Sequence, residues 1–455
     1  MSEIILPEGW TNCTLADIAE VNPKKIEAEQ DINAGFVPMS HAPTNYNGKL
    51  EFEEKTWGEI GKSYTNFKND DVIFAKVTPC FENGKAAIVK DMPNNIGAGS
   101  SEFYVLRARN QEIPASYLLG IIKTRKFMQE GAENMTGAVG LRRVPRAFVE
   151  SFPLILPPLV EQKIIADKLD TLLAQVDSTK ARLEQIPQIL KRFRQAVLAA
   201  AVSGKLTEEW RGTTILIDWK KGILKNFIKK PSYGTSAKSQ KEGLIPVLRM
   251  GNLQSGKVDW SDLVYTSDKN EIEKYKLIAG DILFNRTNSP ELVGKTSIYR
   301  GERDAIYAGY LIKVQCLDGL NPEYLNYHLN SHIAKQYCHE VKSDGVSQSN
   351  INAQKLAAYP LIVPSIEEQA EIVRRVEQLF VYADAIEKQV QSALDRVRNL
   401  TQSILAKAFR GELTAQWRVE NPDLISGKNS ARALLEKIHQ ERSSIKKIKR
   451  GKGNS

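Results

Sequence analysis

The sequence lacks any long apolar run. Its most hydrophobic stretch, residues 152–160 (FPLILPPLV), is short and broken by proline. A helix that crosses a membrane needs about 20 consecutive apolar residues. We therefore expect neither a transmembrane helix nor a secretory signal peptide, and we expect a cytoplasmic protein.

Cysteine is also scarce. The four cysteines, Cys13, Cys80, Cys316 and Cys338, are scattered along the chain without a Cys-x-x-Cys pair or a neighbouring pair of histidines. Zinc sites and disulfide frameworks need closely spaced or matched cysteines. Reduced core cysteines and no metal site are therefore the expectation.

Complete phosphate-binding motifs are missing. The segment Gly251-x4-Gly256-Lys257 matches most of a P-loop, but Val258 stands where Ser or Thr would hold magnesium. A second partial match at residues 294–296 (GKT) has Ser289 in place of the first glycine. Nucleotide binding is not expected.

Catalytic motifs are equally incomplete. Residues 321–324 (NPEY) resemble the Asn-Pro-Pro-Tyr loop of amino-methyltransferases, but Glu323 replaces the second proline and no glycine-rich cofactor loop precedes it. We interpret this segment as the start of a helix. The five histidines show no pairing typical of a Ser-His-Asp triad, and no nuclease cluster of carboxylates and lysine is evident. We expect no catalytic residue and no cofactor bound by this chain.

Strong charge is confined to the end of the sequence. Residues 428–455 hold nine Lys and Arg against two Asp and Glu, so this tail supplies +7 of the net charge of +9. The remaining chain is nearly neutral and would bind nucleic acid through local patches rather than a global field. The tail itself is either a solubilising end or an arm that contacts phosphates.

One long stretch, in contrast, is present twice. Residues 157–211 align with residues 364–418 without a gap, with 15 identities in 55 positions. Glu161-Gln162 returns as Glu368-Gln369, and Gly-x-Leu-Thr-x-x-Trp-Arg occurs at 204–211 and again at 411–418. Such a repeat indicates duplication and a shared geometry.

Both copies carry apolar residues at alternating steps of three and four, the period of a coiled-coil seam. We predict long helices within residues 157–205 and 364–412 that pair with each other; the alternative is two amphipathic helices packed on unrelated surfaces. The predicted seam consists of Ile165, Leu169, Leu172, Val176, Leu183, Ile186, Leu190, Ile372, Val376, Leu379, Ile386, Val390, Val397, Leu400 and Ile404.

The segments before the two helices, 1–156 and 206–363, share one order of short strands, turns and a helix. For example, NDDVIFAKVT at residues 69–78 corresponds to GDILFNRT at 280–287. The fold class expected is α+β: two α/β domains separated by two long antiparallel helices that form a coiled coil, with an internal pseudo-two-fold repeat. Residues 413–455 form the last segment.

Polar, glycine-bearing loops recur at matching places in the two domains. Arg and Lys can bind guanine edges, Asn and Gln can bind adenine edges, and lysines and hydroxyls can hold phosphates. As a duplicated set, these residues favour reading of DNA. The candidates are His41, Asn45, Asn47, Lys76, Thr78, Lys85, Arg142, Arg143 and Arg146 in the first domain, and Arg249, Asn252, Lys257, Arg286, Asn288, Lys295, Ser347, Gln348, Ser349 and Asn350 in the second.

The order domain, long helix, domain, long helix resembles the specificity subunits of type I restriction-modification enzymes. The resemblance covers nearly the whole chain and is sharpest at residues 162–198 and 399–418, which look like the type IA subfamily. It implies that each domain is a target recognition domain for one half of an asymmetric, bipartite site in double-stranded DNA. It also implies that the helices dock two modification subunits, which carry S-adenosylmethionine, and that restriction subunits using ATP and magnesium join them.

Two rival classes stay open on the sequence alone. The chain could be a non-catalytic coiled-coil adaptor that joins two protein partners, or a methyltransferase that acts by itself. A salt-dependent, sequence-specific shift on DNA would separate the first rival from the specificity subunit, and binding of the methyl donor by the purified chain would support the second.

Overall fold

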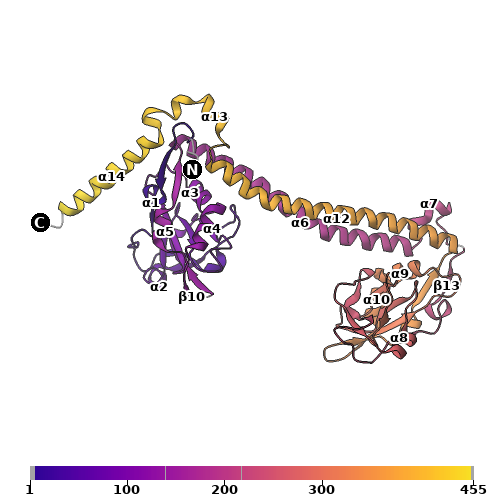
Figure 1. The fold of residues 1–455 in the computed structure, drawn as a ribbon. Helices are drawn as coiled ribbons and strands as arrows, with labels where there is room; N and C mark the ends of the chain where they lie inside the picture. The colour runs from indigo at the N-terminus through magenta and orange to yellow at the C-terminus, as the bar shows by residue number, and fades with distance from the viewer. Residues whose placement is uncertain (1–5, 139, 217, 452–455) are drawn as a thin grey trace. The chain divides into compact units, whose positions relative to one another are not determined.

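The computed structural model describes residues 6–138, 140–216 and 218–451, and the chain divides into two compact units. The first unit comprises Met1–Glu184 with Ser392–Ser455, and the second comprises Gln185–Gln391. Each unit therefore contains one of the two predicted recognition domains and one end of each long helix. In each unit, the two helical segments lie side by side (Figure 1).

The long helices are α6 (Leu159–Val202) and α12 (Ile366–Phe409), of 44 residues each. At about 1.5 Å per residue each is about 66 Å long. In the first unit, the start of α6 buries Ile165 and Leu169 in one core with Leu405 near the end of α12. In the second unit, Leu198 near the end of α6 shares a core with Ile372 near the start of α12. The pairing predicted from the repeat is therefore present, and it is antiparallel, in agreement with the expected fold class.

Burial along the helices follows the predicted seam with one correction. Leu400 is 45% exposed, whereas Leu394 is 9% and Leu405 0% exposed. A straight α-helix drifts by about 20° per heptad against a strict seven-residue repeat, so the buried face moves off Leu400 near the end of α12. Buried seam residues are Ile165, Leu169, Val176, Leu190, Ile372, Val376, Val390 and Ile404; half-buried ones are Leu172, Leu183, Ile186, Leu379, Ile386 and Val397.

The first recognition domain is built on two four-stranded sheets. One has the order β2 (Ala19–Val21), β9 (Phe103–Ala108), β6 (Val72–Ala75) and β7 (Ala86–Ile88). The other has the order β4 (Glu53–Thr56), β3 (Asn33–Val37), β8 (Ile96–Gly99) and β5 (Thr65–Lys68). Two antiparallel pairs complete the strands: β1 (Thr11–Thr14) with β12 (Pro153–Leu156), and β10 (Thr136–Ala138) with β11 (Leu141–Arg143).

The second recognition domain repeats this plan. Its main sheet has the order β14 (Ser232–Tyr233), β23 (Leu311–Val314), β19 (Ile282–Asn285), β21 (Thr296–Ile298), β17 (Gly256–Val258) and β16 (Leu253–Gln254). A smaller sheet has the order β18 (Val264–Thr266), β15 (Ile245–Leu248) and β22 (Ile306–Tyr307). The remaining strands are β13 (Lys220–Ile223) paired with β26 (Pro360–Val363), and β20 (Thr287–Asn288), β25 (Ser349–Asn350) and β24 (Ser343–Asp344) in a three-stranded sheet.

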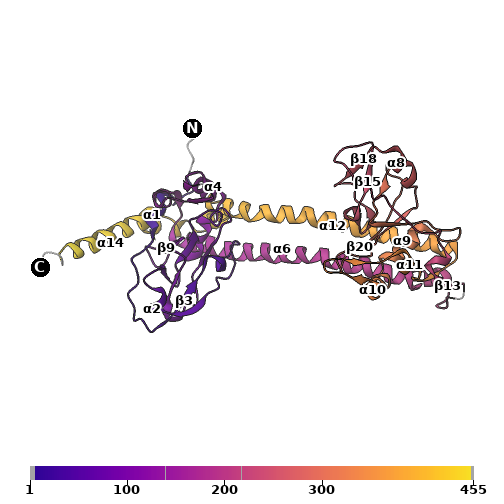
Figure 2. The ribbon, with the colours of Figure 1, turned by 90° about the horizontal axis from the view of Figure 1, so that it is seen from below.

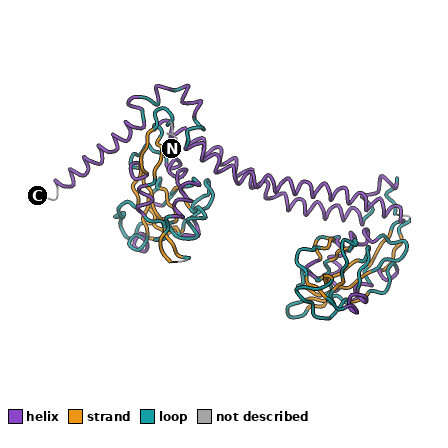
Figure 3. The backbone as a smooth tube through the Cα atoms, viewed as in Figure 1, coloured by secondary structure: helices purple, strands orange, loops and turns teal. Residues whose placement is uncertain are grey.

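Corresponding elements confirm the duplication. The central strands β6 and β19 are buried at every residue, because each lies between two neighbours in its sheet. Figure 2 shows α2 and β3 together in the first domain, and α8, β15 and β18 together in the second. Strands gather within each recognition domain (Figure 3).

Short helices complete the two domains. The first has α1 (Leu15–Ile18), α2 (Trp57–Ile60), α3 (Ala115–Ile122), α4 (Arg125–Glu133) and α5 (Arg146–Ser151). The second unit has α7 (Glu208–Arg211), which follows α6, and then α8 (Lys269–Tyr275), α9 (Pro322–Asn330), α10 (His332–Val341) and α11 (Ala353–Ala357). As predicted, Asn321 starts a helix, because its side chain accepts hydrogen bonds from the backbone N–H groups of Glu323 and Tyr324.

The last segment also belongs to the first unit. After α13 (Ala415–Glu420), α14 (Ala431–Gly451) buries Leu434 and Ile438 in the core of the first domain. His439 Nε2 lies 3.3 Å from Asp17 Oδ1. The start of the tail is therefore a packed helix.

Candidate nucleic-acid interface

In the first domain, a loop and a hairpin meet beside the central strand. The loop follows β6, and its Thr78 N–H donates to the carbonyl of Arg142 in β11 at 3.0 Å, while the N–H of Val144 donates to the carbonyl of Lys76 at 2.9 Å. Strand β10 is exposed throughout. We call Lys76, Thr78, Arg142 and Arg143 with this hairpin the first hairpin site.

Carboxylates hold some of the cationic side chains of the first hairpin site in place. Arg143 Nη2 donates to Glu102 Oε1 at 2.7 Å, and this hydrogen bond holds the pKa of Glu102 below its ordinary value. Arg142 lies 3.9 Å from Glu82 and Lys76 lies over the Tyr104 ring. The site therefore presents a cationic surface with one arginine held in place.

The second domain builds the same arrangement from different side chains. Strand β20, which follows β19, pairs with β25, and the Ile351 N–H donates to the Arg286 carbonyl at 2.8 Å. The turn between β24 and β25 closes where the Gly345 N–H donates to the Gln348 carbonyl at 2.8 Å. Residues Ser347 and Gln348 are exposed in this turn. We call Arg286, Thr287, Asn288 and residues 343–350 the second hairpin site.

Arg286 is held by a residue that sequence reasoning missed. Its guanidinium lies over the Tyr233 ring, 4.8 Å from the centroid, and the Tyr233 hydroxyl accepts from the Ala353 N–H at 3.1 Å. Arg286 Nε is buried without a hydrogen-bond partner in the described chain. Tyr233 is far from Arg286 in the sequence, and no local pattern links them.

The ends of the two long helices carry a second duplicated arrangement, which we call the first and second clasps. In the first clasp the buried Glu161 accepts hydrogen bonds from Trp10 Nε1 at 2.8 Å, from Thr414 Oγ1 at 2.5 Å and from Arg418 Nη1 at 2.5 Å. Arg418 also donates to the Gly411 carbonyl at 2.6 Å.

In the second clasp Glu368 takes the place of Glu161. It accepts from Trp219 Nε1 at 3.0 Å and from Thr207 Oγ1 at 2.7 Å, and it pairs with Arg211. Each clasp thus joins the start of one long helix to the segment after the other. This explains the repeated Glu, Thr and Arg of the motif, whose role the sequence alone did not indicate.

Comparison with known proteins decides the family. The family model described as "Type I restriction modification DNA specificity domain" matches residues 7–188 and 217–396. The chain belongs to the family of type I restriction-modification specificity subunits. It is 39% identical to the type I restriction enzyme EcoKI specificity subunit of Escherichia coli over 97% of both chains, and 39% identical to the StySPI specificity subunit of Salmonella potsdam over 96% of both.

Solved structures support the fold of a specificity subunit. The HsdS subunit from Thermoanaerobacter tengcongensis superposes with a TM-score of 0.63 at 20% identity, over 90% of this chain and 99% of that chain. The resemblance predicted from the sequence is therefore confirmed at the level of family and fold.

Several predicted DNA-contacting residues of this specificity subunit lie elsewhere. Asn252 is 2% exposed, and its amide donates to the carbonyls of Asp259 and Asp262, both at 2.9 Å. Its assignment as a DNA contact is wrong, because a buried amide that caps its own turn cannot bind a base. Arg249 pairs with Asp262 at 3.0 Å and Lys295 donates to Gln254 at 3.3 Å.

Residues that turn toward the long helices form another group. Asn47 donates to Asp177 of α6 at 3.1 Å, and Lys257 pairs with Asp384 of α12 at 3.4 Å. Asp177 and Asp384 occupy equivalent positions of the repeat. These two contacts hold each domain against its own helices.

The remaining candidates serve mainly internal contacts. Lys85 donates to the Met39 carbonyl at 2.8 Å, and the Asn45 carbonyl accepts from Lys123 at 3.3 Å. Arg146 pairs with Glu150 at 2.8 Å. Others are His41, which is half-buried, Ser349, which is buried and donates to Asp344, and Asn350, which donates to Thr287 at 2.8 Å.

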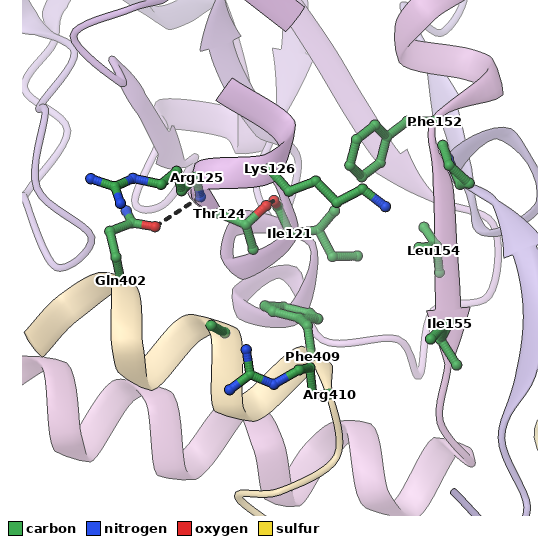
Figure 4. Close-up of a pocket in the computed structure, with 12 residues that line it drawn as sticks. Ile121, Thr124, Arg125, Lys126, Phe152, Leu154, Ile155, Gln402, Phe409 and Arg410 are labelled. Atoms are coloured by element: carbon green, nitrogen blue, oxygen red, sulfur yellow. Dashed lines mark hydrogen bonds between the residues drawn. The ribbon is translucent and has the colours of Figure 1, made fainter. Parts of the chain in front are cut away.

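The first unit also contains a mainly apolar cavity of about 340 Å³. Figure 4 shows Phe409, the last residue of α12, facing Ile121, with Arg410 beside it and with Gln402 accepting from the Arg125 N–H at 2.8 Å. Phe152 and Leu154 also line the cavity. None of the hairpin-site residues lines it. Among the described residues no helix has the length and apolarity to cross a bilayer, and no cluster of His, Cys, Asp or Glu is arranged to hold a metal ion.

Proposed function

We propose that the two hairpin sites read the two halves of an asymmetric, bipartite DNA site. The observation that carries this proposal is the duplication of the hairpin on two matching scaffolds with different side chains. The first site offers Lys76, Arg142 and Arg143, whereas the second offers Arg286, Asn288 and Gln348. Equal scaffolds with unequal side chains would bind unequal base sequences.

The side chains suit base edges. Arginine binds guanine O6 and N7 with two hydrogen bonds, and Asn or Gln binds adenine N6 and N7. Hydroxyls and lysines such as Thr78 and Lys76 suit phosphates, which position the protein without reading sequence. The paired helices between the domains would leave base pairs unread between the half-sites.

The partners follow from the relatives, which are named as subunits of type I restriction enzymes. We propose that this chain supplies recognition in the cytoplasm and that catalysis resides in other subunits. Two modification subunits would carry S-adenosylmethionine, and restriction subunits would use ATP and magnesium. The two clasps support a pair of equivalent docking places, because they present the same motif at both helix-pair ends.

The test is DNA binding by the chain together with its modification subunits, followed by sequencing of methylated sites. We expect a salt-dependent, sequence-specific complex and methylation at one asymmetric motif with an unread spacer. Assembly with protein partners but no sequence-specific binding would favour the adaptor alternative instead.

A further inference from the structure

We infer that a cationic cavity beside the second hairpin site holds a backbone phosphate of the DNA adjoining the second half-site. The inference rests on the proposed DNA-reading function and extends it to a surface outside the hairpin. The cavity has a volume of about 500 Å³. Its lining includes Lys191 of α6, Lys295 of the loop before β21 and Lys335 of α10, together with the apolar Leu198 and Phe380.

In the described structure, the three lysines that line the cavity form no ion pair with a carboxylate. Among the described residues, no carboxylate lies within ion-pair distance of Lys191, Lys295 or Lys335; Glu291 is the one acidic residue in the lining described. Arg194, also in the lining, is already engaged by Asp384 at 2.6 Å. Burial, together with the charge of Lys191, lowers the pKa of Lys335. A bound anion would relieve this repulsion.

Two segments that line the cavity, residues 290–295 and the end of α10, are adjacent in the chain to the second hairpin site. Strand β20 ends at Asn288, and the chain turns at once, where the Val293 N–H donates to the Ser289 carbonyl at 3.0 Å. This turn packs on α10, because a Cβ at Gly294 would meet Cys338 Sγ at 2.7 Å. Helix α10 ends at Val341 and leads into β24 at Ser343. A duplex on the hairpin would therefore bring its phosphates toward the cavity.

An acidic surface of a partner protein is the other anion that could bind here. The first unit has a cavity at the corresponding place, lined by Gly84, Lys123, Met128 and Leu405. Met128 corresponds to Lys335, whereas Arg398 corresponds to Lys191 and keeps its charge. Lys123 Nζ is turned inward to the carbonyls of Thr44 at 3.0 Å and Gly84 at 2.6 Å. A partner bound in two identical copies would need the same charges at both places. The two halves of the DNA site differ in sequence and need not have the same phosphate contacts, so the presence of Met128 in place of Lys335 favours DNA over such a partner.

The experiment uses the full chain with its modification subunits and the double variant Lys191→Gln, Lys335→Gln. Affinity is measured against salt concentration for cognate and unrelated duplexes. Each phosphate contact contributes about 0.9 to the slope of log affinity against log salt. We expect the double variant to lose about 0.9 in slope, the contribution of one phosphate, with the same fold loss of affinity for cognate and unrelated DNA.

Two variants serve as controls. Lys269→Gln removes an exposed lysine at the start of α8, outside the cavity lining, and should leave the slope unchanged. Lys191→Arg, Lys335→Arg keeps both charges and should keep the slope, which separates charge loss from misfolding.

An unchanged slope in the double Gln variant would overturn the inference. The inference would also be overturned if the double Gln variant no longer bound the modification subunits while the slope stayed unchanged. That result would show that the cavity binds an acidic surface of a protein partner. Failure of the wild-type complex to bind DNA sequence-specifically is a different result, since it would overturn the proposed function itself.

Discussion

At the scale of single residues, the two hairpin sites differ in how their arginines are held. Arg143 is tied to Glu102, whereas Arg286 lies over Tyr233 and keeps a buried Nε without a partner. A carboxylate competes with DNA for an arginine, but an aromatic face leaves the guanidinium edge free to donate. We therefore expect Arg286 to read a base of the second half-site.

Replacing Arg286 or Gln348 with Ala should weaken recognition of the second half-site only, by about 1–3 kcal/mol each. The readout is methylation of duplexes in which one half-site at a time is altered, with Arg142→Ala as the matched variant for the first half-site. Tyr233→Phe keeps the ring and should retain most of the recognition, whereas Tyr233→Ala should not. An equal loss at both half-sites would show that these residues do not read bases.

His328 should make the second domain sensitive to acid. It is 4% exposed and lies 2.9 Å from the Tyr359 hydroxyl, and burial lowers its pKa to about 4. The unfolded chain takes up the proton near pH 6.5, so stability is fully present above that pH and falls as the pH drops toward 4.

The loss should reach roughly 3 kcal/mol at pH 4. Denaturant unfolding between pH 7 and pH 4 measures it, and His328→Gln should flatten the dependence in that window. A wild-type profile identical to that of the variant would contradict the assignment.

At the scale of secondary-structure elements, the clasps decide where the long helices end and what they join. Glu161 and Glu368 are buried near the helix starts and receive an arginine, a threonine and a tryptophan from segments far away in sequence. Gly204 and Gly411 end the helices with φ of +76° and +78°, a conformation that favours glycine. The two clasps therefore place the same four residue types, Glu, Trp, Thr and Arg, at both ends of the helix pair.

Glu161→Ala should destabilise the first unit by about 3–5 kcal/mol, because Arg418 would remain as a largely buried, unpaired charge. The double variant Glu161→Ala, Arg418→Ala should be less destabilised than the two single variants together. Chemical denaturation followed by Trp10 fluorescence measures the free energy of unfolding of these variants. The control is Glu412→Ala, which removes an exposed carboxylate. Simple additivity would show that the pair is not coupled.

At the scale of the whole molecule, the duplication makes the two halves interchangeable in principle. The motif 204–211 that follows α6 carries the same Thr and Arg as the motif 411–418 that follows α12. A second copy of the first half could therefore supply to Glu161 the contacts that Thr414 and Arg418 make in the full chain.

A fragment ending at Arg211 should dimerise, because its single long helix would otherwise leave an apolar face in water at about 25 cal/mol per Å². The closed two-fold contact would carry the first recognition domain at both ends. With modification subunits it should methylate a palindromic site made from the first half-site in inverted repeat. Sedimentation and methylation mapping test this, and a soluble monomer would show that the helices are not interchangeable.

Sequence patterns alone determined the parts of this protein that depend on local periodicity. The two long helices and their pairing follow from the spacing of apolar residues, because a buried helix face requires them at every third or fourth position. The repeat and the matching order of the domains follow from aligning the two halves, and the resemblance to the family rests on that order. Only the tertiary structure decided which polar residues meet. It buried Asn252, turned Lys257 toward Asp384, brought Tyr233 under Arg286, and closed the clasps. Contacts between residues that are far apart in the sequence leave no periodic trace in the chain, and a polar side chain has the same identity in sequence whether it faces DNA, a carboxylate or its own backbone.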